Sequence, residues 1–203
     1  VGLQGVTDIK TTRNAIYDLN DGNIVMMDDD LSFRKYKNGK YVKADEASID
    51  LMFKTIENHL NYGFAHCGIC FPNVGIQAKG KPLFNTRYSG LLGLNLRVAK
   101  LLGVKYRTTV MEDFDYALRL IKLGYPSIVF SKWIMETKLN TEGGCSEFRT
   151  QRVQNRGART LEHLHKPFVK AVKAHSWGGM DNRYDVRVSW KKAFSSSVCL
   201  LKN

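Results

Sequence analysis

Four apolar residues that run directly into three aspartates constrain this chain more than any other stretch. Ile24–Met27 is apolar throughout rather than alternating, which predicts a short buried strand. Asp28, Asp29 and Asp30 follow at once and repel one another, so a positive partner is expected at this strand end. In an extended segment Asp28 and Asp30 point the same way while Asp29 points elsewhere. The pair therefore predicts a site for one divalent cation, Mg²⁺ or Mn²⁺, whose other ligands are phosphate oxygens and water.

A second acidic pair, Glu112 and Asp113, opens a predicted helix over 114–123 that ends at Gly124-Tyr125-Pro126. One interpretation is that the pair compensates the helix dipole and caps the helix. The other is catalytic, with Asp113 acting as a general base that takes a proton from an acceptor hydroxyl. The residues alone leave both interpretations open.

The remaining pattern is typical of an α/β protein. We expect further helices over 8–19, 47–60 and 95–102, and extended segments over 62–71 and 127–130. Lys37-Asn38-Gly39-Lys40 predicts a hairpin turn between Tyr36 and Tyr41. The glycine-rich stretch 73–93 is interpreted as a long functional loop.

The net charge of +12 over 203 residues favours a polyanionic partner such as nucleic acid, an acidic membrane surface or a phosphorylated small molecule. The excess is concentrated near the C-terminus. Between positions 149 and 192, eleven Lys and Arg stand against the three acids at 162, 181 and 185. The simpler alternative is a solvated helical face, with His163 and His165 facing solvent or phosphate.

No apolar run approaches the roughly 20 residues of a membrane-spanning helix. The sequence lacks a cationic start followed by an apolar stretch, which argues against secretion. We therefore expect a cytoplasmic protein whose four cysteines, Cys67, Cys70, Cys145 and Cys199, are reduced thiols. A zinc site built from His66, Cys67, Cys70 and Cys145 is a weaker alternative.

The order of these features resembles the GT-A-fold glycosyltransferases. A helix with Thr12-Arg13-Asn14-Ala15 precedes the strand ending in three aspartates, a glycine-bearing loop follows, and Glu112-Asp113-Phe114-Asp115 then opens a helix. The set TRN…MMDDDL…EDFDYALRLIKLGY…EGGCSEFRTQ is, more narrowly, similar to the TET-associated glycosyltransferases of bacteriophages. That family is linked to glycosylation of 5-hydroxymethylpyrimidines in DNA, and the resemblance extends from about residue 7 to residue 192. For a phage-encoded protein it implies the host cytoplasm.

The resemblance implies a role for each matching position. Asp28 and Asp30 match the DxD metal motif, Asp113 matches the base that follows a Glu in inverting members, and His175 matches the late His that completes the metal shell. The donor, most simply a UDP-sugar, would be bound by the remaining set: Thr12, Arg13, Asn14, Asp29, Ser89, Gly90 and Trp177. Trp177, beside two glycines and His175, is interpreted as a platform for the sugar or the base.

The resemblance also suggests how the chain is divided. Residues 1–140 would form a GT-A-like, Rossmann-like catalytic domain with a mixed sheet flanked by helices. Residues 141–203 would form a basic, mainly helical extension that completes the active site. GT-A enzymes carry several βα units before the DxD motif, whereas only 1–23 precede it in this sequence. We therefore expect the N-terminal nucleotide-binding strands to be missing or shortened.

The predicted function is metal-dependent transfer of a sugar from a nucleotide sugar to a hydroxyl of 5-hydroxymethylcytosine, or of another hydroxymethylpyrimidine, in phage DNA. Inversion at the anomeric carbon is expected. The alternatives are a glycosyltransferase acting on a polysaccharide or protein, a metal-dependent nuclease or nucleotidyltransferase, and a noncatalytic basic DNA-binding module. The charge of the 149–192 segment is the reason for preferring DNA as acceptor.

Overall fold

The computed structural model describes residues 8–137, 150–174 and 182–200, with side chains described up to residue 197. Within these ranges the helices are α1 (Ile9–Asp18), α2 (Glu46–Asn61), α3 (Pro72–Ala78), α4 (Leu96–Leu101), α5 (Glu112–Lys122), α6 (Gln151–His165) and α7 (Trp190–Leu200). The strands are β1 (Asn23–Met27), β2 (Leu31–Lys37), β3 (Lys40–Lys43), β4 (His66–Cys70), β5 (Leu83–Phe84), β6 (Leu91–Asn95), β7 (Ile128–Thr137), β8 (Val169–Lys173) and β9 (Tyr184–Val188).

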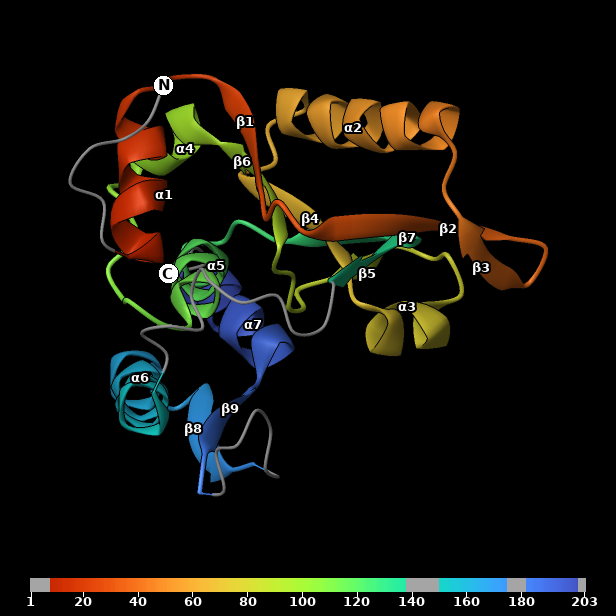
Figure 1. The fold of residues 1–203 in the computed structure, drawn as a ribbon. Helices are drawn as coiled ribbons and strands as arrows, with labels where there is room; N and C mark the ends of the chain where they lie inside the picture. Colours follow the sequence, from red (N-terminus) through yellow and green to blue (C-terminus); the bar gives the residue numbers. More distant parts are fainter. Residues whose placement is uncertain (1–7, 138–149, 175–181, 201–203) are drawn as a thin grey trace.

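A central sheet with helices on both faces organises the molecule (Figure 1). Its described strands follow the order β1-β6-β4-β7-β2-β3, and β5 pairs with β7. Among the pairings within these strands, only that between β4 and β7 is parallel. The predicted mixed α/β class is confirmed, and the sheet is mostly antiparallel, consistent with a Rossmann-like arrangement.

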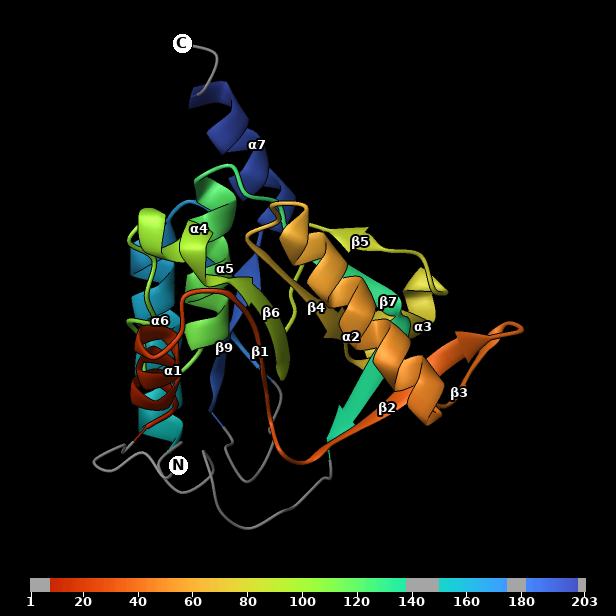
Figure 2. The ribbon, with the colours of Figure 1, turned by 90° about the horizontal axis from the view of Figure 1, so that it is seen from above.

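The two faces of the sheet bury two different apolar clusters. Met52, Ile56 and Leu60 of α2 pack against one face, and Figure 2 shows α2 lying across the strands. Tyr17 of α1 and Tyr116 of α5 belong to the cluster on the other face. Neighbouring residues of β6 alternate between these clusters, as side chains of a strand must. The sheet is therefore a platform with α2 on one side and α1, α4 and α5 on the other.

Local sequence signals explain several elements. The Asp8 carboxylate accepts a hydrogen bond from the Thr11 N–H at 2.8 Å and caps α1. Asp45 caps α2 in the same way through the Ser48 N–H. The hairpin prediction is also confirmed, because Tyr36 pairs with Tyr41 across a turn at Asn38-Gly39 where both φ angles are positive. The helices predicted over 95–102 and 114–123 correspond to α4 and α5.

Two predictions about the sheet are wrong in part. β1 is an edge strand in which only Met26 is buried, whereas its apolar composition predicted burial on both faces. The stretch 73–93 is not one long loop, since it contains most of α3, all of β5 and the start of β6. Both errors arise because burial and pairing depend on which strands become neighbours, which composition does not report.

The C-terminal part packs on α5. α6, β8, β9 and α7 enclose a third apolar cluster together with Phe114, Leu118 and Ile121 of α5. The antiparallel pair of β8 and β9 lies between the two helices in the sequence, so the described part of the segment combines two helices with two short strands. α6 approaches the segment between α4 and α5 closely at Gly157, where an added Cβ would lie 2.2 Å from Cγ2 of Val110. In the part of the chain that is described, no helix has the length and apolarity needed to cross a membrane.

Candidate active site

The three aspartates occupy the turn between β1 and β2. β1 pairs with β6 up to Met27 and Leu91, which brings the turn beside the residue that precedes β6. There the Asp28 N–H donates to the Gly90 carbonyl at 2.9 Å. Gly90 has a φ of +75°, and a Cβ at this position would lie 3.5 Å from Oδ2 of Asp28. The structure therefore places the predicted Ser89-Gly90 loop directly against the predicted metal ligand.

The turn differs in detail from the predicted extended geometry. Asp29 and Asp30 lie in a hydrogen-bonded turn rather than in a strand. Asp28 and Asp30 are nevertheless both partly buried, whereas Asp29 is exposed. The two flanking residues are thus less exposed than Asp29.

The second acidic motif forms the first turn of α5. Glu112 and Asp113 are 6% and 7% exposed, so both carboxylates are largely removed from water. Met111, which precedes them, is in the left-handed region with a φ of +56° and provides no side-chain cap. The positive end of the helix dipole compensates part of the acidic charge, as in the structural interpretation of this pair.

Arg13 lies between the two acidic motifs. Its Nη1 donates to Oε1 of Glu112 at 2.7 Å, and its Nη2 lies 3.9 Å from Oδ1 of Asp28. Burial alone would lower the pKa of Arg13, but Tyr106 and the nearby carboxylates outweigh burial and raise it. The positive partner expected beside the aspartates is therefore present in the protein, on α1.

Burial and crowded negative charge dominate the electrostatics around Asp28. Burial raises the pKa of Asp28, Arg13 partly opposes this, and repulsion from Asp30, Asp113 and Asp29 raises the pKa further. Asp113 is thus close enough to the metal-motif aspartates to repel them. The acidic corner, defined as Asp28, Asp30, Glu112 and Asp113, combines residues from β1–β2 and α5 in one electrostatic unit.

Arg87 is a neighbour of this corner that the sequence patterns did not single out. Its Nη2 lies 3.9 Å from Oδ2 of Asp113, and its guanidinium lies over the Phe114 ring at 4.3 Å from the centroid. The side chain is 50% exposed, so it remains accessible to an anionic ligand. Its position just before the Ser89-Gly90 loop was the only sequence signal that could have indicated it.

The other two residues of the Thr-Arg-Asn motif make contacts within the protein. The Thr12 hydroxyl donates to the Asp8 carbonyl at 3.0 Å, within the first turn of α1. The Asn14 side chain donates to the Tyr106 carbonyl at 2.8 Å and accepts from the Tyr106 N–H at 3.0 Å. Asn14 thereby joins α1 to the segment that leads into α5.

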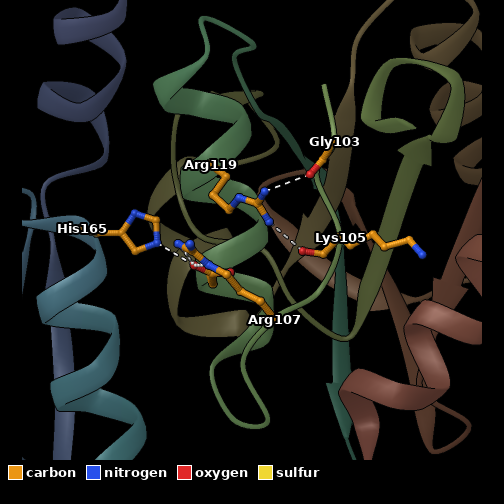
Figure 3. Close-up of polar contacts among 6 residues, drawn as sticks. Gly103, Lys105, Arg107, Arg119 and His165 are labelled. Carbon is orange, nitrogen blue, oxygen red and sulfur yellow. Dashed lines mark hydrogen bonds and ion pairs between the residues drawn. The ribbon is translucent and has the colours of Figure 1, made fainter. Parts of the chain in front are cut away.

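Asp115, two positions after Asp113, is held by a network that the sequence analysis missed. Arg107 donates to both carboxylate oxygens through Nε, at 3.0 and 2.9 Å, and His165 Nε2 donates to Oδ1 at 2.8 Å. Figure 3 shows Arg107 and His165 pointing to the same group. The neighbouring Arg119 donates to the carbonyls of Gly103 and Lys105.

This network corrects the prediction that His165 faces solvent or phosphate. His165 is fully buried, because positions 154, 158, 161 and 165 form the face of α6 that packs inward. His163 lies on the opposite side and is exposed. Burial alone would raise the pKa of Asp115, but the hydrogen bonds from His165 and Arg107 outweigh burial and lower the pKa. Asp115 is thus an ionised anchor for α6.

The donor set at Asp28 and Asp30 fits a hard divalent cation. Within the described residues, no group of three or more His, Cys, Asp or Glu side chains gathers to hold a metal. Mg²⁺ is commonly bound through one or two carboxylates, with substrate phosphates and water as its other ligands. A site of two half-buried carboxylates suits that mode of binding. His175 and Trp177 lie outside the described residues.

The CxxC stretch on β4 is part of the core. Burial raises the pKa of the Cys67 thiol to about 12 and that of Cys70 to about 11, so both are neutral. His66 Nδ1 is hydrogen-bonded to the Tyr88 hydroxyl, and Nε2 donates to the Tyr125 carbonyl at 3.1 Å. These contacts favour neutral thiols over a zinc site at His66, Cys67 and Cys70, and Cys145 lies outside the described residues.

The fold and the acidic corner together are typical of α/β enzymes that bind phosphorylated substrates at strand ends. Comparison with known families is more specific. A model described as TET-Associated Glycosyltransferase matches residues 7–144, and the chain belongs to this family. It is accordingly a glycosyltransferase, as predicted. No curated protein and no solved structure matches the chain. α6 to α7 lie beyond the matched residues.

Proposed function

We propose that the chain transfers a sugar from a nucleotide-sugar donor to a hydroxyl acceptor, with a divalent cation held by Asp28 and Asp30. The observation that carries this proposal is the acidic corner, in which two motifs far apart in the sequence of a glycosyltransferase meet around Arg13. When bound there, Mg²⁺ or Mn²⁺ would offset the charge of the leaving diphosphate. A UDP-sugar is the simplest donor, and Ser89, Gly90 and the exposed Asp29 are the proposed contacts beside the cation.

Asp113 is the proposed general base. It takes the proton from the acceptor hydroxyl as that oxygen bonds to the anomeric carbon. The bond between this carbon and the diphosphate oxygen breaks, and its electron pair leaves with the nucleoside diphosphate. Attack from the side opposite the leaving group gives inversion. Arg87 is accessible beside Asp113 and would attract an anionic group of the donor or acceptor. Glu112 supports this arrangement through Arg13.

The proposed acceptor is a hydroxymethylpyrimidine, such as 5-hydroxymethylcytosine, in DNA. Arg152, Arg156 and Arg159 are exposed on α6 at spacings that place them on one face. They line a groove together with Gln151, Asn155, Thr160, His163 and Leu164. Positive charge along such a groove suits the phosphate backbone, which is bound without sequence preference. A base inside a duplex would also have to be flipped out, at a cost of a few kcal/mol. The cytoplasm, where DNA and nucleotide sugars occur together, is the proposed location.

The test is incubation of the chain with hydroxymethylated DNA, Mn²⁺ and a panel of nucleotide sugars, followed by mass spectrometry of the nucleosides. We expect a glycosylated nucleoside with one donor, and its loss on chelation of Mn²⁺ or with Asp30→Ala. Asp21→Ala is the matched control, because Asp21 is an exposed carboxylate just before β1 whose partner is the surface residue Lys100. Equal transfer by Asp30→Ala and Asp21→Ala would contradict the metal site.

The acceptor class is tested separately. Arg152→Gln combined with Arg156→Gln should raise KM for hydroxymethylated DNA and weaken its salt dependence, while leaving transfer to the free nucleoside unchanged. Transfer to a polysaccharide or protein but not to DNA would contradict the proposed acceptor and retain the transferase. DNA cleavage would instead indicate a nuclease.

A further inference from the structure

Arg13 is the one guanidinium that the described ion pairs place against both acidic motifs. It lies on α1, 99 positions before Glu112 in the sequence, and is 6% exposed. Its guanidinium also lies 5.5 Å from the centroid of the Tyr106 ring. The Arg13 side chain is thus surrounded by protein groups on several sides, and carboxylates within the protein compensate its charge.

The geometry suits arginine rather than lysine. A planar guanidinium presents several N–H groups in a fixed fork, so one side chain reaches Glu112 with Nη1 while Nη2 faces Asp28. An ammonium on a flexible stem is a single point charge and would approach one carboxylate at a time. Arg13 therefore sets the separation between the end of β1 and the first turn of α5.

We propose that Arg13 is a positioning residue: an internal counter-charge that holds the two acidic motifs together and sets how tightly the corner binds a divalent cation. The part of this inference that concerns binding of a divalent cation rests on the proposed function. The direct alternative, contact of Arg13 with the nucleotide, is disfavoured because only 8% of the side chain is exposed and its best hydrogen bond is to Glu112.

Two consequences follow from the charges. Without Arg13, the carboxylates of the acidic corner repel one another with less compensation, so the metal-free protein loses stability. Removal of Arg13 also removes a positive charge that repels an incoming Mn²⁺, so the acidic corner binds the ion more tightly. Arg13 thus keeps the affinity for the free ion moderate, which suits a cation that arrives and leaves with a diphosphate.

The first experiment compares thermal unfolding in chelator for Arg13→Gln, Asp28→Asn and the double variant of the full chain. We expect Arg13→Gln to lower Tm by about 10 °C, since it removes the guanidinium that donates to the buried Glu112 carboxylate at 2.7 Å. Asp28→Asn should restore part of this loss, because it removes repulsion that Arg13 had compensated. Arg34→Gln is the matched control, because it removes an equal charge from a surface pair with Glu136. Strictly additive Tm changes would overturn the proposal.

The second experiment titrates Mn²⁺ alone into the same proteins, followed by calorimetry. Arg13→Gln should bind Mn²⁺ about tenfold more tightly than the unaltered chain, and Arg34→Gln should bind it equally well. Arg13→Lys keeps the charge and should restore the moderate Mn²⁺ affinity while recovering little of the unfolding temperature. Weaker Mn²⁺ binding by Arg13→Gln would overturn the proposal.

The two experiments separate this inference from the proposed function. If no protein in the set binds Mn²⁺, the divalent site of the proposed function is refuted, and the unfolding in chelator still decides whether Arg13 is the counter-charge. If Mn²⁺ binds but Arg13→Gln lowers donor affinity without changing Mn²⁺ affinity, then Arg13 contacts the nucleotide and the inference is overturned.

Discussion

Asp113 and Asp115 lie two positions apart in the first turn of α5, yet their surroundings differ in kind. Asp115 is fully buried and accepts hydrogen bonds from Arg107 and His165. For Asp113, which is 7% exposed, the described residues provide no side-chain hydrogen bond, and the nearest cation is Arg87 at 3.9 Å. Asp115 is thus held through both carboxylate oxygens, whereas the described residues offer Asp113 only the ion pair with Arg87.

This difference matches the roles that we propose for the two carboxylates, a structural role for Asp115 and that of general base for Asp113. Buried polar groups in native proteins are nearly always hydrogen-bonded. Asp115 meets this rule and joins the C-terminal segment to α5. Asp113 belongs to the acidic corner, where the hydroxyl of the proposed acceptor would donate to it.

The largest expected effect is on transfer. Asp113→Asn should lower the turnover number by about 10²- to 10⁴-fold, the usual contribution of a general base. Donor affinity should stay within about twofold, and the unfolding temperature should change little, since no side-chain hydrogen bond is lost among the described residues. Initial rates and donor titration check this, with Glu136→Gln on the surface as control. Near-normal turnover would show that Asp113 is not the base.

The complementary change should act on stability. Asp115→Asn should lower the free energy of unfolding by about 3 kcal/mol, because it removes the negative charge of the carboxylate that both Arg107 and buried His165 contact. Chemical denaturation measures this loss, with exposed Asp50→Asn as the control. A variant as stable as the control would mean that Asp115 does not anchor α6.

A third buried group, His66, should make the stability of the protein depend on pH in a way that the aspartates do not. Burial lowers the pKa of His66 to about 4 from 6.5, so the unfolded state takes up a proton at a higher pH than the folded state. Stability should therefore fall as pH decreases from about 6.5 to 4, by roughly 3 kcal/mol at about 1.4 kcal/mol per unit.

Denaturation at several pH values measures the slope, which His66→Gln should flatten. Above its ordinary pKa of 3.8, Asp115 is ionised in both the folded and the unfolded state, so its contribution should vary little with pH in that window. A slope that persists in His66→Gln and disappears in Asp115→Asn would reverse this assignment.

The smallest expected effect concerns Arg87. Arg87→Ala should lower kcat/KM by about tenfold, since an accessible positive charge beside the acidic corner is lost while Asp113 keeps its burial. Arg87→Lys should recover part of the loss, and exposed Arg97→Ala should have no effect. Kinetics at two salt concentrations check this, because an electrostatic contribution weakens with ionic strength. An unchanged kcat/KM would remove Arg87 from the site.

The sequence by itself determined the features that depend on neighbouring residues. The cap at Asp8, the turn at Asn38-Gly39 and the start of α5 all follow from backbone preferences and hydrogen bonds over a few positions. The acidic motifs could be named for the same reason, because each is a short run of residues with one chemistry.

Only the tertiary structure decided which residues face one another. Arg13 and Glu112 are 99 positions apart, and His165 and Asp115 are 50 positions apart. Such pairs depend on how α1 and α6 pack against α5, and on which strand becomes the edge of the sheet. A charge pattern along the chain cannot report that packing, because ion pairs and burial are set by distances in space rather than by sequence separation.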